Sequence, residues 1–69
     1  MEKNKQIAYF YNSEFNADDT QVDMDGDIGV PQKGEIIEKY GELWKVEIVM
    51  VDHSFSGALP VHRVYLVRA

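Results

Sequence analysis

The sequence has 69 residues, of which 45% are hydrophobic and 28% charged, with a formal net charge of −5 and no cysteine. This length predicts one domain, residues 1–69, with a thin stability margin because a chain of this size buries only about 60% of its unfolded surface. The lack of cysteine excludes a disulfide framework and a thiolate zinc site. The negative charge argues against general nucleic-acid binding, for which a basic surface is expected.

Targeting and membrane segments are not indicated. No apolar run approaches the roughly 18 residues that a membrane-spanning helix requires. The first residues, MEKNKQ, lack the apolar segment of a secretion signal. We therefore expect a soluble, cytoplasmic protein that does not interact with membranes.

The N-terminal third predicts two strands joined by a loop. Residues 5–12, KQIAYFYN, alternate with period two and place Ile7 and Tyr9 on one face. The loop that follows carries Phe15 as an anchor toward the core. Residues 20–25 form the second predicted strand, in which Val22 and Met24 alternate with the polar residues Gln21, Asp23 and Asp25.

A third strand is predicted over residues 35–39. The dipeptide Tyr40-Gly41 fits a two-residue hairpin connection, because glycine supplies positive φ at low cost. This turn predicts two cross-strand pairs, Lys39 with Glu42 and Ile37 with Trp44.

Residues 43–69 are typical of one long hairpin that contributes the fourth and fifth strands. Residues 54–57 interrupt the apolar pattern with small residues and a glycine. A register that opposes Asp52 to Arg63 also opposes Glu47 to Arg68, which pairs opposite charges twice. The same register pairs Met50 with Tyr65, Ile48 with Val67, Val49 with Leu66, Val51 with Val64 and His53 with His62.

This register makes both faces of the hairpin apolar. One face is the predicted core, formed by Trp44, Val46, Ile48 and Met50 with Tyr65 and Val67. A hairpin that is apolar on both faces either curls into a small barrel or covers its second face with another subunit. In the second case, the oligomer interface would consist of Val49, Val51, Val64 and Leu66.

The run VPQKGEIIEKYGELWKVEIVMVD combines Pro-x-x-Gly-Glu, an apolar strand, a tight turn and a Trp-x-Val strand. The region that contains this run, residues 30–69, resembles small SH3-like β-barrel proteins of bacteria and their phages, most of which have no assigned activity. The resemblance implies a strongly bent sheet and supplies no catalytic residues. The predicted fold class is all-β, a five-stranded SH3-like small barrel or strongly bent antiparallel sheet.

The alternating carboxylates Asp23, Asp25 and Asp27 are similar to those of a calcium loop. An EF-hand loop requires glycine at its sixth position and glutamate at its twelfth, where this chain has Ile28 and Gly34. A turn with solvated carboxylates is the favoured interpretation, and we expect neither a metal nor another cofactor.

Two histidines and two arginines form the predicted ligand site. His53 and His62 could bind a transition metal, or an anion when protonated, although two exposed histidines are the simpler interpretation. Arg63, Arg68 and Tyr65 could add to an anion-binding surface, because arginine suits bidentate contacts with phosphate. The competing interpretation is that the two arginines form cross-strand salt bridges. The aromatic side chains are expected to belong to the core: Tyr9, Phe10, Tyr11, Phe15 and Trp44.

We therefore expect a non-catalytic binding module from a bacterium or phage, not an enzyme. Its ligand would be a protein partner or a small anionic, nucleotide-like molecule held at a subunit interface. In a phage, either mode of binding would suit an inhibitor of a host defence system. The alternatives are a structural homo-oligomer or virion-associated protein without a small-molecule ligand, and a small metal-dependent enzyme that uses the aspartates or the histidines.

Overall fold

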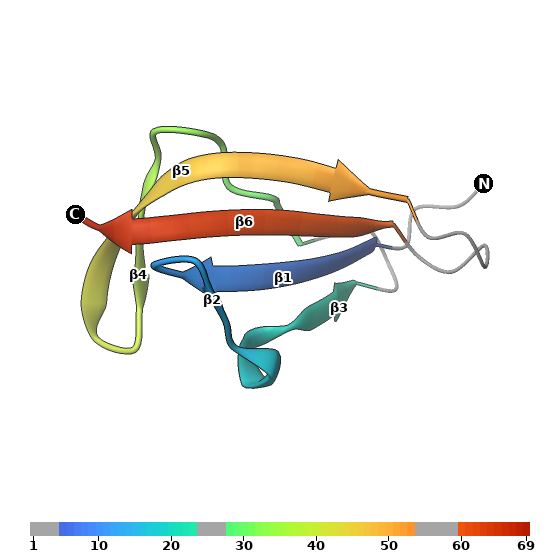
Figure 1. The fold of residues 1–69 in the computed structure, drawn as a ribbon, viewed down its shortest axis with the longest axis horizontal. Helices are drawn as coiled ribbons and strands as arrows, with labels where there is room; N and C mark the ends of the chain where they lie inside the picture. Colours follow the sequence, from blue (N-terminus) through green and yellow to red (C-terminus); the bar gives the residue numbers. More distant parts are fainter. Residues whose placement is uncertain (1–4, 24–27, 54–59) are drawn as a thin grey trace.

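The computed structural model describes residues 5–23, 28–53 and 60–69. Its elements are β1 (Lys5–Tyr11), β2 (Glu14–Phe15), a 3-10 helix η1 (Ala17–Asp19), β3 (Gln21–Asp23), β4 (Ile36–Lys39), β5 (Glu42–Asp52) and β6 (Val61–Arg68). The strands form one sheet in the order β2-β1-β6-β5-β4, and β3 also pairs with β1 (Figure 1). The all-β prediction is confirmed. The sheet has six strands within the described residues and does not close into a barrel.

The sheet is mixed, so the predicted antiparallel arrangement is wrong at one position. β1 runs parallel to β6, from the pair Gln6 and Val61 to the pair Tyr11 and Leu66. The remaining strand pairs are antiparallel. Because β6 uses one edge for β5 and the other for β1, the long hairpin lies in the middle of the sheet instead of forming one side of it.

The turn between β4 and β5 matches its prediction. Tyr40 has φ +55° and Gly41 φ +76°, the left-handed backbone that a two-residue turn of this kind requires. Both predicted cross-strand pairs occur, Lys39 with Glu42 and Ile37 with Trp44.

The predicted register of β5 and β6 is wrong. The ladder instead opposes Trp44 to Arg68, Val46 to Leu66, Ile48 to Tyr65, Val49 to Val64, Met50 to Arg63 and Asp52 to Val61, with an irregularity between Val46 and Ile48. Such a β-bulge adds one residue to β5 and reverses the direction of the side chains beyond it. Val46 is therefore fully buried, whereas Ile48 and Met50 are 46% and 48% exposed.

The charge pair that suggested the register is nevertheless present. Arg63 Nη2 lies 2.6 Å from Asp52 Oδ2. Asp52 is opposite Val61, so its carboxylate reaches Arg63 diagonally, two residues further along β6. Diagonal neighbours lie within reach of long side chains, and a salt bridge therefore does not determine the register.

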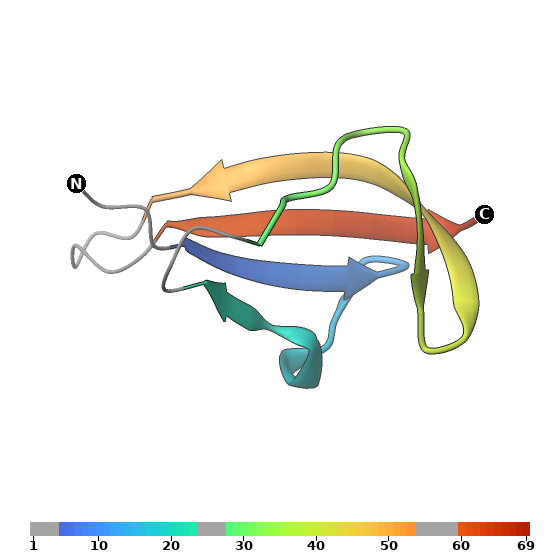
Figure 2. The ribbon, with the colours of Figure 1, turned by 180° about the vertical axis from the view of Figure 1, so that it is seen from behind.

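The predicted oligomer interface lies largely inside the chain's own core. Val64 and Leu66 are fully buried, Val49 packs against them, and only Val51 is half exposed, at 50%. The buried core cluster consists of Ile7, Tyr9, Trp44, Val46, Val64 and Leu66. Figure 2 shows residues 28–35 crossing this face of the sheet, where Ile28 and Val30 pack on the core. We call this covered side the inner face.

β3 buries a carboxylate and exposes its valine. Val22 is 50% exposed, and Asp23 is buried at 4%. The pairing of Val22 with Gln6 places Val22 on the side of the sheet opposite the core. The Asp23 carboxylate is compensated on the inner face, where it lies 2.8 Å from Lys5 Nζ and accepts a hydrogen bond from the Ile28 backbone N–H at 2.7 Å.

The other side of the sheet, the outer face, carries many apolar side chains. One row crosses β5, β6, β1 and β2 and consists of Ile48, Tyr65, Phe10 and Phe15. The next row consists of Met50, Arg63 and Ala8. Within the described residues, no helix is long and apolar enough to cross a membrane.

Candidate functional site

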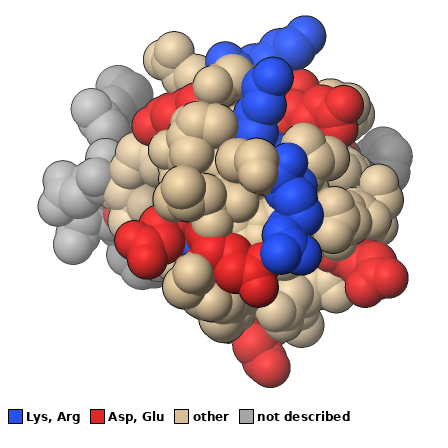
Figure 3. All heavy atoms as spheres, turned by 90° about the vertical axis from the view of Figure 1, so that its left-hand side faces the viewer, with Lys and Arg blue, Asp and Glu red and all other residues tan. Residues whose placement is uncertain are grey.

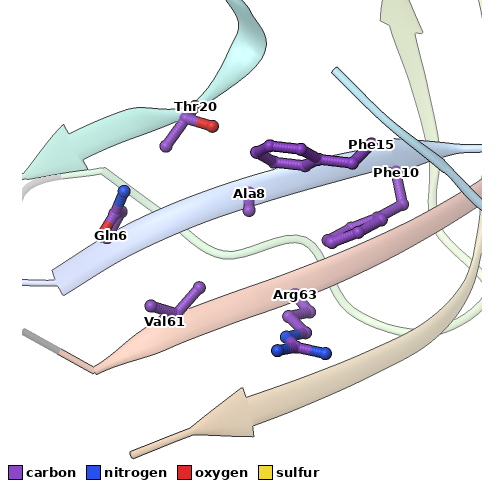
Figure 4. A pocket seen from close by; sticks show the side chains of 7 residues that line it. All are labelled: Gln6, Ala8, Phe10, Phe15, Thr20, Val61 and Arg63. Atoms are coloured by element: carbon purple, nitrogen blue, oxygen red, sulfur yellow. The ribbon is translucent and has the colours of Figure 1, made fainter. Parts of the chain in front are cut away.

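An open hollow of about 380 Å³ lies on the outer face between β1, β2 and β6. Its lining residues are Gln6, Ala8, Phe10, Phe15, Thr20, Val61 and Arg63. Figure 4 shows Ala8 between the two phenylalanine rings on one side and Gln6 and Val61 on the other. The small side chain of Ala8 leaves the space, and larger side chains on neighbouring strands form the walls.

The aromatic wall of the hollow results from a tight turn. Asn12 and Ser13 have φ +53° and +72° and join β1 to β2, which places Phe10 opposite Phe15. The centroids of these two rings are 5.1 Å apart. On its other side, the Phe10 ring stacks on Tyr65 at 4.6 Å and an interplanar angle of 21°.

Arg63 supplies the positive charge of the hollow. Its side chain is 40% exposed and bonded to Asp52. The pKa of Arg63 is raised above its ordinary value, first by a side-chain hydrogen bond with Tyr65 and next by the charge of Asp52. A guanidinium has five N–H donors in a planar fork, so Arg63 retains donors for a ligand while it is bonded to Asp52.

The structure brings together only two of the five predicted ligand residues, Arg63 and Tyr65. Arg68 lies at the far end of β6, where Nε is 3.0 Å from Glu42 Oε1. The predicted pair of Arg68 with Glu47 is therefore wrong, because Arg68 lies opposite Trp44 in the observed register. Both arginines form salt bridges, as the competing interpretation predicts, but only Arg63 does so with the predicted partner, Asp52.

The two histidines are not opposite each other. His62 lies opposite Val51 and pairs with Ile7 on its other side, and His53 follows the last residue of β5. The pKa of His62 is lowered by burial, by Lys5 and by His53, in that order of size. These effects disfavour the protonated imidazole, which is the form that would hold an anion.

Charges of both signs alternate at the end of the molecule that carries the β4–β5 turn and the C-terminus. Figure 3 shows a row of Lys and Arg side chains across this end, with carboxylates on both sides of the row. Interleaved charges favour local salt bridges over a broad anion-binding surface.

Of the three alternating carboxylates, only Asp23 is described, since residues 24–27 lie outside the described residues. The prediction of a solvated carboxylate is wrong at Asp23, because this side chain is buried and bonded to Lys5. Across residues 5–23, 28–53 and 60–69, no group of three or more His, Cys, Asp or Glu side chains could hold a metal ion.

The sequence reasoning missed most of the hollow. Phe10 and Phe15 were assigned to the core or to a loop anchor, whereas Phe15 is 55% exposed. The signal that could have located them is Asn12-Ser13, a pair of turn-forming residues between two apolar runs. That signal predicts a hairpin that places the two rings side by side.

No family model, curated protein or solved structure matches this chain. The resemblance to SH3-like proteins therefore stays a prediction, and the proposed function rests on the geometry alone.

Proposed function

We propose that this chain is a non-catalytic binding module and that the hollow on the outer face is its ligand site. The observation that carries the proposal is the combination of apolar and aromatic walls with one cation at the same opening. Ligand sites commonly have a mostly apolar lining and a few polar groups that fix the orientation of the ligand. The residues fit a ligand with a flat, apolar body and one anionic group.

Each part of such a ligand has a partner in the hollow. The rings of Phe10 and Phe15 offer a surface for a planar group, since aromatic rings stack at such distances. Arg63 offers N–H donors to a phosphate or carboxylate. The lining contains one hydroxyl, that of Thr20, and no carboxylate or imidazole among the described residues. Binding is therefore the activity that we assign, without a reaction.

Isothermal titration calorimetry with adenosine monophosphate tests this proposal, with inorganic phosphate as the probe that lacks a planar group. We expect saturable binding of the nucleotide and weaker binding of phosphate. Arg63→Ala should weaken nucleotide binding about tenfold or more, because a hydrogen bond to a charged group is lost. The variant should remain folded, since exposed salt bridges contribute little to stability.

Arg68→Ala is the matched control for Arg63→Ala. It removes the same charge and a second exposed salt bridge, but Arg68 does not line the hollow. Nucleotide binding should be unchanged in this variant. The proposal fails if the wild-type chain does not bind the nucleotide, or if both arginine variants weaken binding equally.

A second function, homo-oligomer formation, is favoured by the exposed apolar side chains of the outer face. Phe15, Val22, Ile48 and Met50 lie on this face and are each between 46% and 55% exposed. Contiguous apolar surface of this kind is typical of protein contacts. The inhibition of a host defence by a phage protein stays a prediction, because no characterised protein matches the chain.

A further inference from the structure

A second hollow, of about 320 Å³, lies between the β4–β5 turn and the segment that includes β2 and the start of η1. We call it the aromatic notch, and its lining residues are Tyr11, Glu14, Phe15, Asn16, Ala17, Tyr40 and Trp44. Four of these seven residues are aromatic and one is a carboxylate. The notch differs from the hollow on the outer face, which has an arginine in place of the carboxylate.

Two of the rings are held in place by hydrogen bonds of their own. Tyr11 donates its hydroxyl to the Asp19 carboxylate. Trp44 Nε1 donates to the Lys39 backbone carbonyl at 3.2 Å. The Tyr11 and Trp44 rings meet edge to face, with centroids 5.0 Å apart and an interplanar angle of 75°. The polar atoms of both rings are thus already bonded, and the notch is formed before any ligand enters.

Tyr40 completes the aromatic surface at a conformational cost. It has φ +55°, a left-handed backbone that is unfavourable for most L side chains, and asparagine or glycine is favoured there. Burial does not offset this cost, since Tyr40 is 66% exposed. Its ring lies 5.7 Å from that of Tyr11, and Asn16 Nδ2 donates to its hydroxyl at 3.3 Å. A strained, exposed tyrosine at the mouth of a hollow indicates a role in binding.

The charge around the notch favours a cation. Glu14 lines the notch and Asp18 follows shortly after it, and both side chains are exposed. Within the described part of the chain, neither carboxylate forms a salt bridge. The nearby cations are already neutralised, Lys39 by Asp19 at 3.3 Å and Arg68 by Glu42 at 3.0 Å.

One ring beside the notch, Tyr9, and one ring that lines it, Trp44, already hold cations of the chain itself. Lys39 Nζ lies 3.9 Å from the centroid of the Tyr9 ring, and the Arg68 guanidinium carbon lies 5.7 Å from that of Trp44. Both distances are within the range of cation–π attraction. We propose that the aromatic notch binds an arginine or lysine side chain of a partner protein, with the cation against the rings of Tyr40 and Tyr11 and beside the Glu14 carboxylate.

Trp44 is the only tryptophan of the chain and lines the notch, so its fluorescence reports on binding there. The probe is Nα-acetyl-arginine methylamide, and the uncharged control is Nα-acetyl-norleucine methylamide. We expect a saturable change in Trp44 emission with the arginine probe and a much smaller response to the norleucine probe. An equal response to both would overturn the proposal, since it would show an apolar site without preference for a cation.

Tyr40→Asn separates binding from folding, because asparagine tolerates the left-handed turn position. The free energy of unfolding of this variant should be equal to or higher than that of the wild type. Its affinity for the arginine probe should fall about fivefold or more, the loss expected when one cation–π contact is removed. Unchanged affinity in a folded Tyr40→Asn chain would overturn the proposal.

The carboxylate is tested by Glu14→Gln, with Glu47→Gln as the matched control. Glu47 is exposed and does not line the notch, so the control changes the net charge without changing the site. We expect weaker binding of the arginine probe by Glu14→Gln and unchanged binding by Glu47→Gln. Equal weakening in both variants would indicate general attraction to an acidic protein and would contradict a specific site.

Discussion

At the scale of single residues, a few buried polar groups link separate parts of the chain. Asp19 is 9% exposed, accepts the Tyr11 hydroxyl and lies 3.3 Å from Lys39 Nζ. The same ammonium lies over the Tyr9 ring. Burial, and to a smaller extent Asp19, raises the pKa of Tyr9. These contacts tie η1 to β1 and β4, which are far apart in the sequence.

His62 should make stability depend on pH. Its pKa in the folded chain is lowered by burial and by electrostatic repulsion from Lys5 and His53, from an ordinary value near 6.5. As pH falls through about 6.5, the unfolded chain takes up a proton that the folded chain resists, so the free energy of unfolding decreases. Between pH of about 7.5 and about 5.5, the wild type should lose more stability than His62→Gln.

Urea unfolding at the two pH values measures this difference, because the carboxylates titrate in both chains and cancel in the comparison. An equal loss of stability in the wild type and in His62→Gln would show that the environment of His62 does not affect its protonation.

At the scale of elements, β5 determines the arrangement of the sheet. Its first half pairs with β4 through a two-residue turn and buries Trp44 and Val46. The bulge then exchanges the two faces, so that Ile48 and Met50 point outward. One irregularity in one strand thereby turns Val49 toward the core and places Ile48 and Met50 on the outer face that carries the hollow.

Gly41→Ala should destabilise the β4–β5 turn. Gly41 has φ +76°, so a Cβ at this position costs about 1 kcal/mol of unfolding free energy even though no heavy atom lies within 4 Å of it. Gly29→Ala is the control, since its Cβ would also meet nothing within 4 Å and its φ lies outside the left-handed range. Chemical denaturation of both variants should show a loss only for Gly41→Ala.

Two alanine substitutions, one on each side of the bulge, test whether the bulge reverses the direction of the β5 side chains. Val46→Ala should cost about 2 kcal/mol, because a fully buried side chain loses two methyl groups. Ile48→Ala should cost less than about 1 kcal/mol, because Ile48 is 46% exposed. An uninterrupted strand would bury both residues, and equal losses in urea unfolding would therefore contradict the bulge.

At the scale of the whole molecule, the sheet has one covered face and one open face. The segment with Ile28 and Val30 covers the inner face, so the core is completed within one chain. The outer face carries the hollow and the exposed apolar residues Phe15, Val22, Ile48 and Met50. This face can accommodate a ligand, or it can meet a second copy of the chain.

Assembly through the outer face predicts a mass that rises with concentration to that of a dimer. Met50→Lys should keep the chain monomeric, because a charge would enter the apolar contact. Val51→Lys is the control, since Val51 is equally exposed but points to the inner side of β5. Light scattering over a range of concentrations distinguishes these outcomes. A wild-type mass that stays at that of one chain would contradict assembly.

The sequence by itself determined the local features of this protein. Period-two patterns located the apolar strands, and Tyr40-Gly41 gave the correct turn and both of its cross-strand pairs. These features depend on residues within a few positions of one another, so the relevant interactions are contained in the local pattern.

The tertiary structure alone decided which faces are covered. The bulge in β5 has no sequence signal. The parallel pair of β1 and β6 brings together strands from opposite ends of the sequence. Residues 28–30 cover the inner face, which is formed by strands that are distant from them in the sequence. The hollow combines β1, β2 and β6, and the notch combines the β2 segment with the β4–β5 turn. A single extra residue in β5 reverses every side chain after it, and period-two patterning cannot detect that change when both faces are apolar.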